Sequence, residues 1–232
     1  MDTGFIELRP KYFLNENWEI IEPIPPEGAL KAETPEEDLK KWIESTVIKV
    51  AEVADTKVIS SDNQYDYLKS ELGMNIILPK GRIEKMRFKI TLKGDGYVSD
   101  KVVAIDGFPK DVIEEKYIIE GKIKVGITKL FKFIPVIGKL PEGLLEIELN
   151  PWEFKIGSLR RVNIDFSGGL TFFPEWFFKE DGIKNDLRVA LTIRKHKGVN
   201  RVEGDVVSAW IYDPGVLKKP IVQTDAGTIR IY

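Results

Sequence analysis

The chain contains a single histidine, His196, so chemistry that needs an imidazole base can occur at only one position. A Ser-His-Asp triad uses histidine as its base. The Gly-x-Ser-x-Gly elbow that would carry a nucleophilic serine does not occur in the sequence. His196 lies in the basic run Arg194–Lys197 between two alternating segments, as a charged hairpin turn would. We therefore predict a solvated hairpin turn at His196 rather than a catalytic base.

The sequence carries no common phosphate-binding motif and no thiolate metal site. The sequence has neither a Walker loop nor Gly-x-Gly-x-x-Gly, and the absence of cysteine excludes disulfides, thiolate metal sites and cysteine nucleophiles. Asp95, Asp100 and Asp106 lie near a turn and could share a calcium ion, but their spacing does not match an EF-hand loop. The sequence favours surface carboxylates there and leaves ion binding open. We expect no catalytic residue, no cofactor site and no metal site.

Carboxylates are numerous, and two of them could form the pair that glycoside hydrolysis needs. One alternative is therefore a β-sandwich carbohydrate-binding module or carbohydrate-active enzyme. In that interpretation Trp176 and Trp152 would stack on sugar rings, with Glu175 as a nearby acid.

The charge balance argues against nucleic acid as a partner. The chain has 35 basic and 37 acidic residues, which gives a net charge of −2, whereas nucleic-acid binding favours a clustered basic excess. The short basic runs Arg160–Arg161 and Lys195–Lys197 are interpreted as solvated. Charged residues reach 31% of the chain, and glutamine occurs only at Gln64 and Gln223, a composition typical of proteins from hot environments.

The N-terminus lacks the basic and apolar segments of a signal peptide, and no apolar stretch is long enough for a transmembrane helix. We expect synthesis in the cytoplasm, followed either by retention there or by incorporation into a virion or extracellular assembly.

Two helices are predicted in the N-terminal third. With an extended entry before them they form a segment, residues 1–74, which we expect to pack on the domain that follows. Thr34, Pro35 and Glu37 resemble the start of a helix, and apolar residues spaced three and four apart extend it to about residue 54. A second helix is predicted over 62–72, ending at Gly73.

From residue 75 the apolar period changes from 3.6 to 2, which indicates strands. The alternating runs begin at Met86, Tyr117, Leu145, Val162, Leu187, Val206 and Thr228. Alternation with one polar face is typical of antiparallel sheets. The predicted class is α+β, with a β-sandwich or jelly-roll-like domain of eight to ten strands over 75–232.

Two apolar segments alternate poorly and could make contacts with a partner. Residues 171–178 contain five aromatic rings, and residues 129–140 form an apolar run edged by lysines. Burial within the chain is the commoner outcome for such segments, but exposed apolar patches mark interaction surfaces. The chain also remains strand-like up to Tyr232, and a terminal strand can add to the sheet edge of a neighbour or pair within its own sheet.

These features favour a non-catalytic structural protein that self-associates or binds other subunits, such as a virion, tail or filament subunit from a thermophilic source. The expected contact residues are Phe172, Phe173, Trp176, Phe177, Phe178, Ile229, Ile231 and Tyr232.

Overall fold

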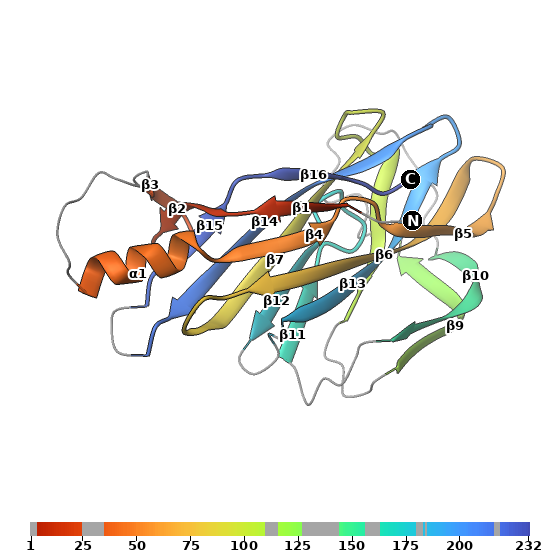
Figure 1. Ribbon diagram of the computed structural model, residues 1–232. Helices are drawn as coiled ribbons and strands as arrows, with labels where there is room; N and C mark the ends of the chain where they lie inside the picture. The colour runs from red at the N-terminus through yellow and green to blue at the C-terminus, as the bar shows by residue number, and fades with distance from the viewer. Residues whose placement is uncertain are drawn as a thin grey trace.

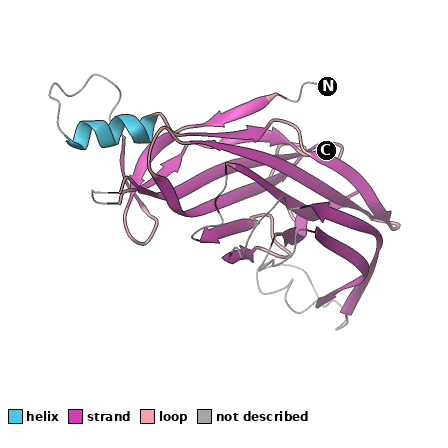
Figure 2. Ribbon diagram, turned by 60° about the horizontal axis from the view of Figure 1, so that its bottom comes forward, coloured by secondary structure: helices cyan, strands magenta, loops and turns pink. Residues whose placement is uncertain are grey.

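The chain forms two layers of antiparallel β-sheet with one short helix at one end (Figures 1 and 2). The computed structural model describes residues 4–24, 35–109, 116–126, 144–155, 163–179, 183, 185–215 and 219–232. Within these ranges there are sixteen strands and one helix. The prediction of an antiparallel sandwich is in line with this arrangement, whereas the α+β class with two helices is wrong.

The smaller of the two layers is a six-stranded sheet in the order β1-β4-β6-β13-β8, with β5 paired to β6 beside β4. Its strands are β1 (Phe5–Leu8), β4 (Val47–Ala51), β5 (Asp55–Ser61), β6 (Tyr65–Ile77), β8 (Val102–Phe108) and β13 (Asp186–His196).

The larger layer has eight strands in the order β11-β12-β7-β14-β15-β2-β3, with β16 also paired to β14. Its strands are β2 (Pro10–Leu14), β3 (Ile20–Pro23), β7 (Arg82–Gly94), β11 (Asn163–Ser167), β12 (Glu175–Lys179), β14 (Val202–Asp213), β15 (Ile221–Thr224) and β16 (Gly227–Arg230). Two further strands, β9 (Lys116–Gly126) and β10 (Leu144–Lys155), form a separate antiparallel pair.

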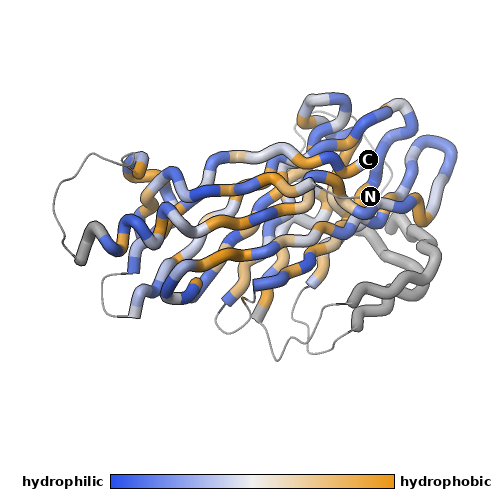
Figure 3. The backbone as a smooth tube through the Cα atoms, in the orientation of Figure 1, coloured by the Kyte–Doolittle hydropathy of each residue, from blue (hydrophilic) through white to orange (hydrophobic). Residues whose placement is uncertain are grey.

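The core lies between the two layers, where alternate residues of the long central strands are buried. Figure 3 shows apolar and polar residues alternating along these strands. On β7 the buried series is Met86, Phe88, Ile90 and Leu92, as the period-2 pattern predicts. The largest buried rings come from the larger sheet: Trp176, Trp210, Tyr212, Phe88 and Phe178. Burying a whole aromatic side chain stabilises a fold by roughly 1.5–3 kcal/mol. These rings therefore contribute a large part of the free energy of folding.

The first predicted helix is present but shorter than expected. Helix α1 begins at Pro35, as predicted, but ends at Glu44 instead of continuing to residue 54. Thr46 closes it by donating its hydroxyl to the carbonyl of Trp42 (2.9 Å), and the chain then enters β4. The β-branched residues Val47, Ile48 and Val50 favour strand over helix. Thr34 lies outside the described residues.

The second predicted helix is wrong, because residues 65–77 form strand β6. Leu68 and Leu72, four residues apart, fit a period of 2 as well as a period of 3.6, and Ser70 and Met74 complete the alternating buried face. Asp62 makes the preceding turn by accepting hydrogen bonds from the backbone N–H groups of residues 64 and 65. Gly73, predicted to cap a helix, lies in the middle of this strand.

Two glycine-containing sites allow close approach of the chain to itself. The predicted turn at 94–96 is present as a tight hairpin in which Asp95 and Gly96 both have positive φ (49° and 88°), a conformation that favours Gly and Asp. At Gly107 a Cβ atom would lie 2.1 Å from the ring of Phe166, so only glycine lets the two strands β8 and β11 approach so closely.

The C-terminal strand β16 pairs within its own chain. Residues 203–206 of β14 lie along one edge of β16. On the other edge, the backbone N–H of Arg230 donates to the carbonyl of Glu52 (2.8 Å), and that of Ala54 donates to the carbonyl of Arg230 (2.9 Å). Strand β16 therefore connects the two sheets.

The expected boundary between residues 74 and 75 falls inside β6, and strands from both sides of it pair in both layers. The apolar run 129–140 and the basic pair Arg160–Arg161 lie outside the described residues. In the described part of the chain, no helix has the length and apolar character needed to cross a membrane.

The aromatic segment gives a direct test of this core. Trp176 is completely buried and the neighbouring Phe173 is 42% exposed. Trp176→Ala should lower the free energy of unfolding by about 3–5 kcal/mol, as for other truncated core aromatics. Phe173→Ala, the matched control, should change it by about 1 kcal/mol or less. Equal losses in denaturant titrations would contradict this assignment of inside and outside.

Candidate functional site

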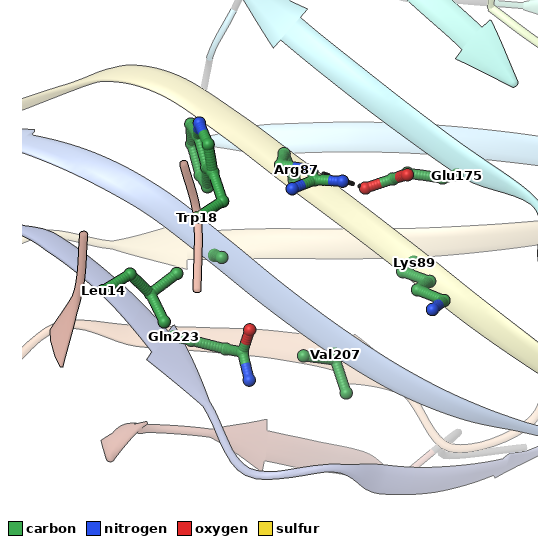
Figure 4. Close-up of a pocket in the computed structure, with 8 residues that line it drawn as sticks. Leu14, Trp18, Arg87, Lys89, Glu175, Val207 and Gln223 are labelled. Carbon is green, nitrogen blue, oxygen red and sulfur yellow. Dashed lines mark hydrogen bonds and ion pairs between the residues drawn. The ribbon is translucent and has the colours of Figure 1, made fainter. Parts of the chain in front are cut away.

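The outer face of the larger sheet carries a hollow of about 210 Å³ (Figure 4). It is smaller than the roughly 300–1,000 Å³ pockets that take drug-sized ligands, so it suits one small group rather than an extended one. The lining combines an aromatic ring, charged groups, an amide and apolar walls: Leu14, Trp18, Arg87, Lys89, Glu175, Val207, Ala209 and Gln223.

Strand register places these side chains in two neighbouring rows. In the first row, Arg87 on β7 lies opposite Ala209 on β14, which lies opposite Gln223 on β15. In the second row, Glu175 on β12 lies opposite Lys89, which lies opposite Val207.

The hollow exists because β14 contributes short side chains between longer ones. Ala209 and Val207 form its floor, while Arg87 and Gln223 stand on either side of Ala209. Since adjacent strands are about 4.8 Å apart, Arg87 and Gln223 are separated by roughly 10 Å at the backbone.

Trp18 reaches this face from the tight turn between β2 and β3. The side-chain oxygen of Asn15 accepts hydrogen bonds from the backbone N–H groups of Asn17 and Glu19 (2.9 and 3.0 Å). The backbone N–H of Trp18 donates to the carbonyl of Asn15 (3.0 Å). Trp18 itself has a φ of 65°, a left-handed conformation that costs a residue other than glycine roughly 1–2 kcal/mol. The turn therefore holds the indole at an energetic cost.

The indole ring extends across the sheet to β7 and β12. Its centroid lies 5.4 Å from the guanidinium carbon of Arg87 and 5.8 Å from the ring centroid of Phe177, which it meets edge to face. Cation–π and edge-to-face contacts contribute about 0.5–1.5 kcal/mol each. These contacts fix the ring at the border of the hollow, and Figure 4 shows the indole beside Arg87.

Two cations and one carboxylate set the charge of the hollow. Arg87 donates through Nε to Oε1 of Glu175 (2.6 Å). Lys89 is exposed, and its ammonium lies 5.0 Å from the ring centroid of Phe173. Within the described residues Lys89 has no ion-pair partner, so the lining has a net charge of about +1.

The lining of the hollow combines one carboxylate with groups that can bind a polar ligand. Glycoside hydrolysis by the usual routes needs two carboxyl groups on opposite sides of the scissile bond. Among the residues that line the hollow, Glu175 is the single carboxylate, and it is ion-paired with Arg87. A pyranose can offer an apolar C–H face to an aromatic ring, while its hydroxyl groups bond to carboxylate, amide and guanidinium groups.

The expected contact residues divide between the core and the surface. Four of them are buried inside the chain, at 2% exposure or less: Trp176, Phe178, Ile229 and Ile231. Phe172 and Phe177 are half-buried. Phe173 and Tyr232 are exposed. In this fold the first group gives no surface to a partner, so any contact through these residues would rest on Phe173, Tyr232 and the exposed parts of Phe172 and Phe177.

His196, predicted to lie in a solvated hairpin turn, is the last residue of strand β13. Nδ1 of His196 accepts a hydrogen bond from the backbone N–H of Gly198 (3.0 Å), and the ring meets Tyr65 edge to face.

The neighbouring Lys195 differs from its prediction as a solvated residue, because it is 3% exposed. Its ammonium donates to the carbonyl of Val199 (2.9 Å) and pairs with Asp66 (3.2 Å). Burial alone would raise the pKa of Asp66, but hydrogen bonds from Ser61 and Lys195 hold that pKa below its usual value. This lysine therefore fixes the end of β13 to β6.

Two of the three acids that could share an ion, Asp95 in the turn and Asp106 on β8, accept backbone hydrogen bonds. Asp95 accepts hydrogen bonds from the backbone N–H groups of Asn200 and Arg201 (3.1 and 3.0 Å), and Asp106 accepts one from that of Gly107 (2.8 Å). No group of three potential metal ligands comes together in the described part of the chain.

Sequence reasoning found Glu175 but missed Trp18, Arg87, Lys89 and Gln223. The proposed sugar-stacking residue Trp176 is buried, and the side chain of Trp152 lies outside the described residues. One signal for Trp18 was present: Asn15-Glu16-Asn17 between two apolar runs indicates a hairpin turn, which places the next residue near a sheet surface. The other residues could be found only from strand order.

No protein-family model matches the sequence, and no curated protein does. A crystal structure of the Clostridium perfringens NetB toxin in its membrane-inserted form aligns over 98% of this chain and 92% of its own, with 12% sequence identity and a TM-score of 0.29. A similarity this low supports no conclusion about fold or function.

Trp18→Gly should empty one side of the hollow without unfolding the protein. Glycine accepts the positive φ of this position, and the relieved backbone strain offsets the lost contacts of a half-buried ring. The free energy of unfolding should therefore change by about 1 kcal/mol or less. A loss of about 3 kcal/mol or more in chemical denaturation would show that Trp18 belongs to the core.

Proposed function

We propose that this chain is a non-catalytic carbohydrate-binding protein and that the hollow is its binding site. The observation that carries the proposal is the placement of Trp18 beside hydrogen-bonding side chains on a rigid sheet. A ring supplies a flat apolar surface, and Glu175 and Gln223 offer oxygens that can accept hydroxyl hydrogens.

The rigidity of the site supports the same proposal. Arg87, Lys89 and Glu175 stand on strands paired on both sides, since β7 lies between β12 and β14, and β12 lies between β11 and β7. Sites held on regular elements lose little conformational freedom when a ligand binds, which favours affinity from a small contact area.

Binding can be tested with a panel of mono- and oligosaccharides, measured by titration calorimetry on the whole chain. Trp18→Gly should weaken binding at least about tenfold, which corresponds to about 1.4 kcal/mol. Trp18→Tyr keeps an aromatic ring and should recover part of the loss. Tyr97→Ala, which removes an exposed ring outside the lining, is the control. If the parent binds no saccharide, or if Trp18→Gly binds as tightly as the parent, the proposal is wrong.

A second function, assembly into a larger structure, is supported by the outer edge of the larger sheet. Strand β3 ends the strand order and is exposed along its whole length, with Ile20 at 55% and Ile21 at 61%. An open strand edge presents unpaired backbone donors and acceptors to another chain. Glu22 and Pro23 protect this edge only in part. A neighbouring subunit could therefore add a strand beside β3.

Assembly through β3 predicts that the mass of the parent in solution rises with concentration. Ile21→Lys should abolish this rise while leaving the monomer folded, because a charge on an edge strand opposes pairing. Ile77→Lys is the matched control, since Ile77 is also exposed (42%) but lies at the end of β6 in the other sheet. A parent that stays monomeric at high concentration, or an Ile21→Lys variant that associates like the parent, would contradict this second function.

A further inference from the structure

We infer that the hollow selects a sugar that carries one carboxylate, of the hexuronate type, and that Lys89 is the residue that recognises the carboxylate. This inference rests on the proposed carbohydrate-binding function and adds the ligand class and the residue that determines it.

The first argument is the charge of the lining. Arg87 and Glu175 neutralise each other at 2.6 Å, which leaves Lys89 as the cation without a carboxylate partner among the described residues. A neutral sugar would leave that charge uncompensated at the border of the site. A carboxylate on the ligand supplies one negative charge for one positive charge.

The second argument is the position of Lys89. It stands directly opposite Glu175 on one neighbouring strand and Val207 on the other, so it borders the floor of the hollow. Its ammonium lies over the ring of Phe173, an exposed residue. This cation–π contact is weak, so the carboxylate of a ligand can replace it. A flexible lysine can move from that ring to a carboxylate without disturbing the sheet.

The third argument separates a carboxylate from a phosphate. A sugar phosphate carries up to two negative charges near neutral pH, one more than Lys89 can match. The second charge would find no unpaired cation in the lining, because Arg87 is already paired with Glu175. A singly charged carboxylate needs Lys89 alone, while Glu175 and Gln223 remain available for the hydroxyl groups.

The remaining charges on the same face do not compete for this role. Lys93, further along β7, is ion-paired with Asp205, and Lys179 on β12 is ion-paired with Asp165. Lys85 lies on the same face of β7, four residues before Lys89, but does not line the hollow. It therefore provides a matched control that removes the same charge from the same strand.

The experiment compares sugar pairs that differ only in the carboxylate. D-glucuronate against D-glucose and D-galacturonate against D-galactose are titrated into the parent chain, with glucose 6-phosphate as a third arm. We expect each uronate to bind at least about tenfold more tightly than its neutral partner, because a charge-assisted hydrogen bond is roughly twice as strong as a neutral one. This preference should shrink as salt rises from about 0.05 to about 0.5 M.

The Lys89→Gln variant should lose the preference and bind glucuronate and glucose about equally. Lys85→Gln should keep the preference of the parent. Loss of the preference in both variants would show a general effect of positive charge on this face and would overturn the role of Lys89. A persistent preference in Lys89→Gln would overturn it as well.

Three further results would contradict the inference. Equal binding of uronates and neutral sugars by the parent would refute the anionic ligand while leaving the carbohydrate-binding function intact. Tighter binding of glucose 6-phosphate than of glucuronate would refute the singly charged ligand. Failure of every neutral and acidic sugar to bind would refute the proposed function together with the inference.

Discussion

The rest of the structure depends on the apolar core packed between the two sheets. Strand β7 pairs with β14 along almost their full length, and β6 pairs with β13 in the same way on the other side of the core. Most of the core-facing residues of these strands are large and apolar, because they fill the space between the layers. The buried indoles of Trp176 and Trp210 meet this requirement in the larger sheet.

The same requirement leaves the outer face free to vary. On β7 and β14, the residues between the core positions point outward. Packing against the other sheet therefore does not set their sizes. A dip therefore arises where β14 presents Val207 and Ala209 between longer neighbours. A single turn then adds the aromatic wall, because Asn15 fixes the backbone that carries Trp18. The core supplies rigidity, and the hollow needs few additional residues.

The period-2 pattern predicted the core strands β7, β13 and β14, because alternation is a local property of the sequence. Over residues 62–72 helix was predicted and is wrong, since residues four apart satisfy both periods and only pairing with β13 decides between them. The hollow was still less predictable. Its residues come from β2 and the turn that follows it, β7, β12, β14 and β15, and their proximity follows from a strand order in which β14 lies between β7 and β15. Strand order reflects long-range packing, which no local pattern contains.

Register connects the core to the proposed site most directly in β12. Trp176 and Phe178 point inward, while Glu175 and Phe177 point outward. A slip of one residue would exchange the two sets, placing a carboxylate in the core and an indole in water. The burial of Trp176 therefore fixes the position of Glu175 beside Arg87, and Phe177 is fixed beside Trp18 for the same reason. Residues 171–178, whose rings were predicted as contact residues, therefore stabilise the sandwich with their inward side chains and complete the hollow with their outward ones.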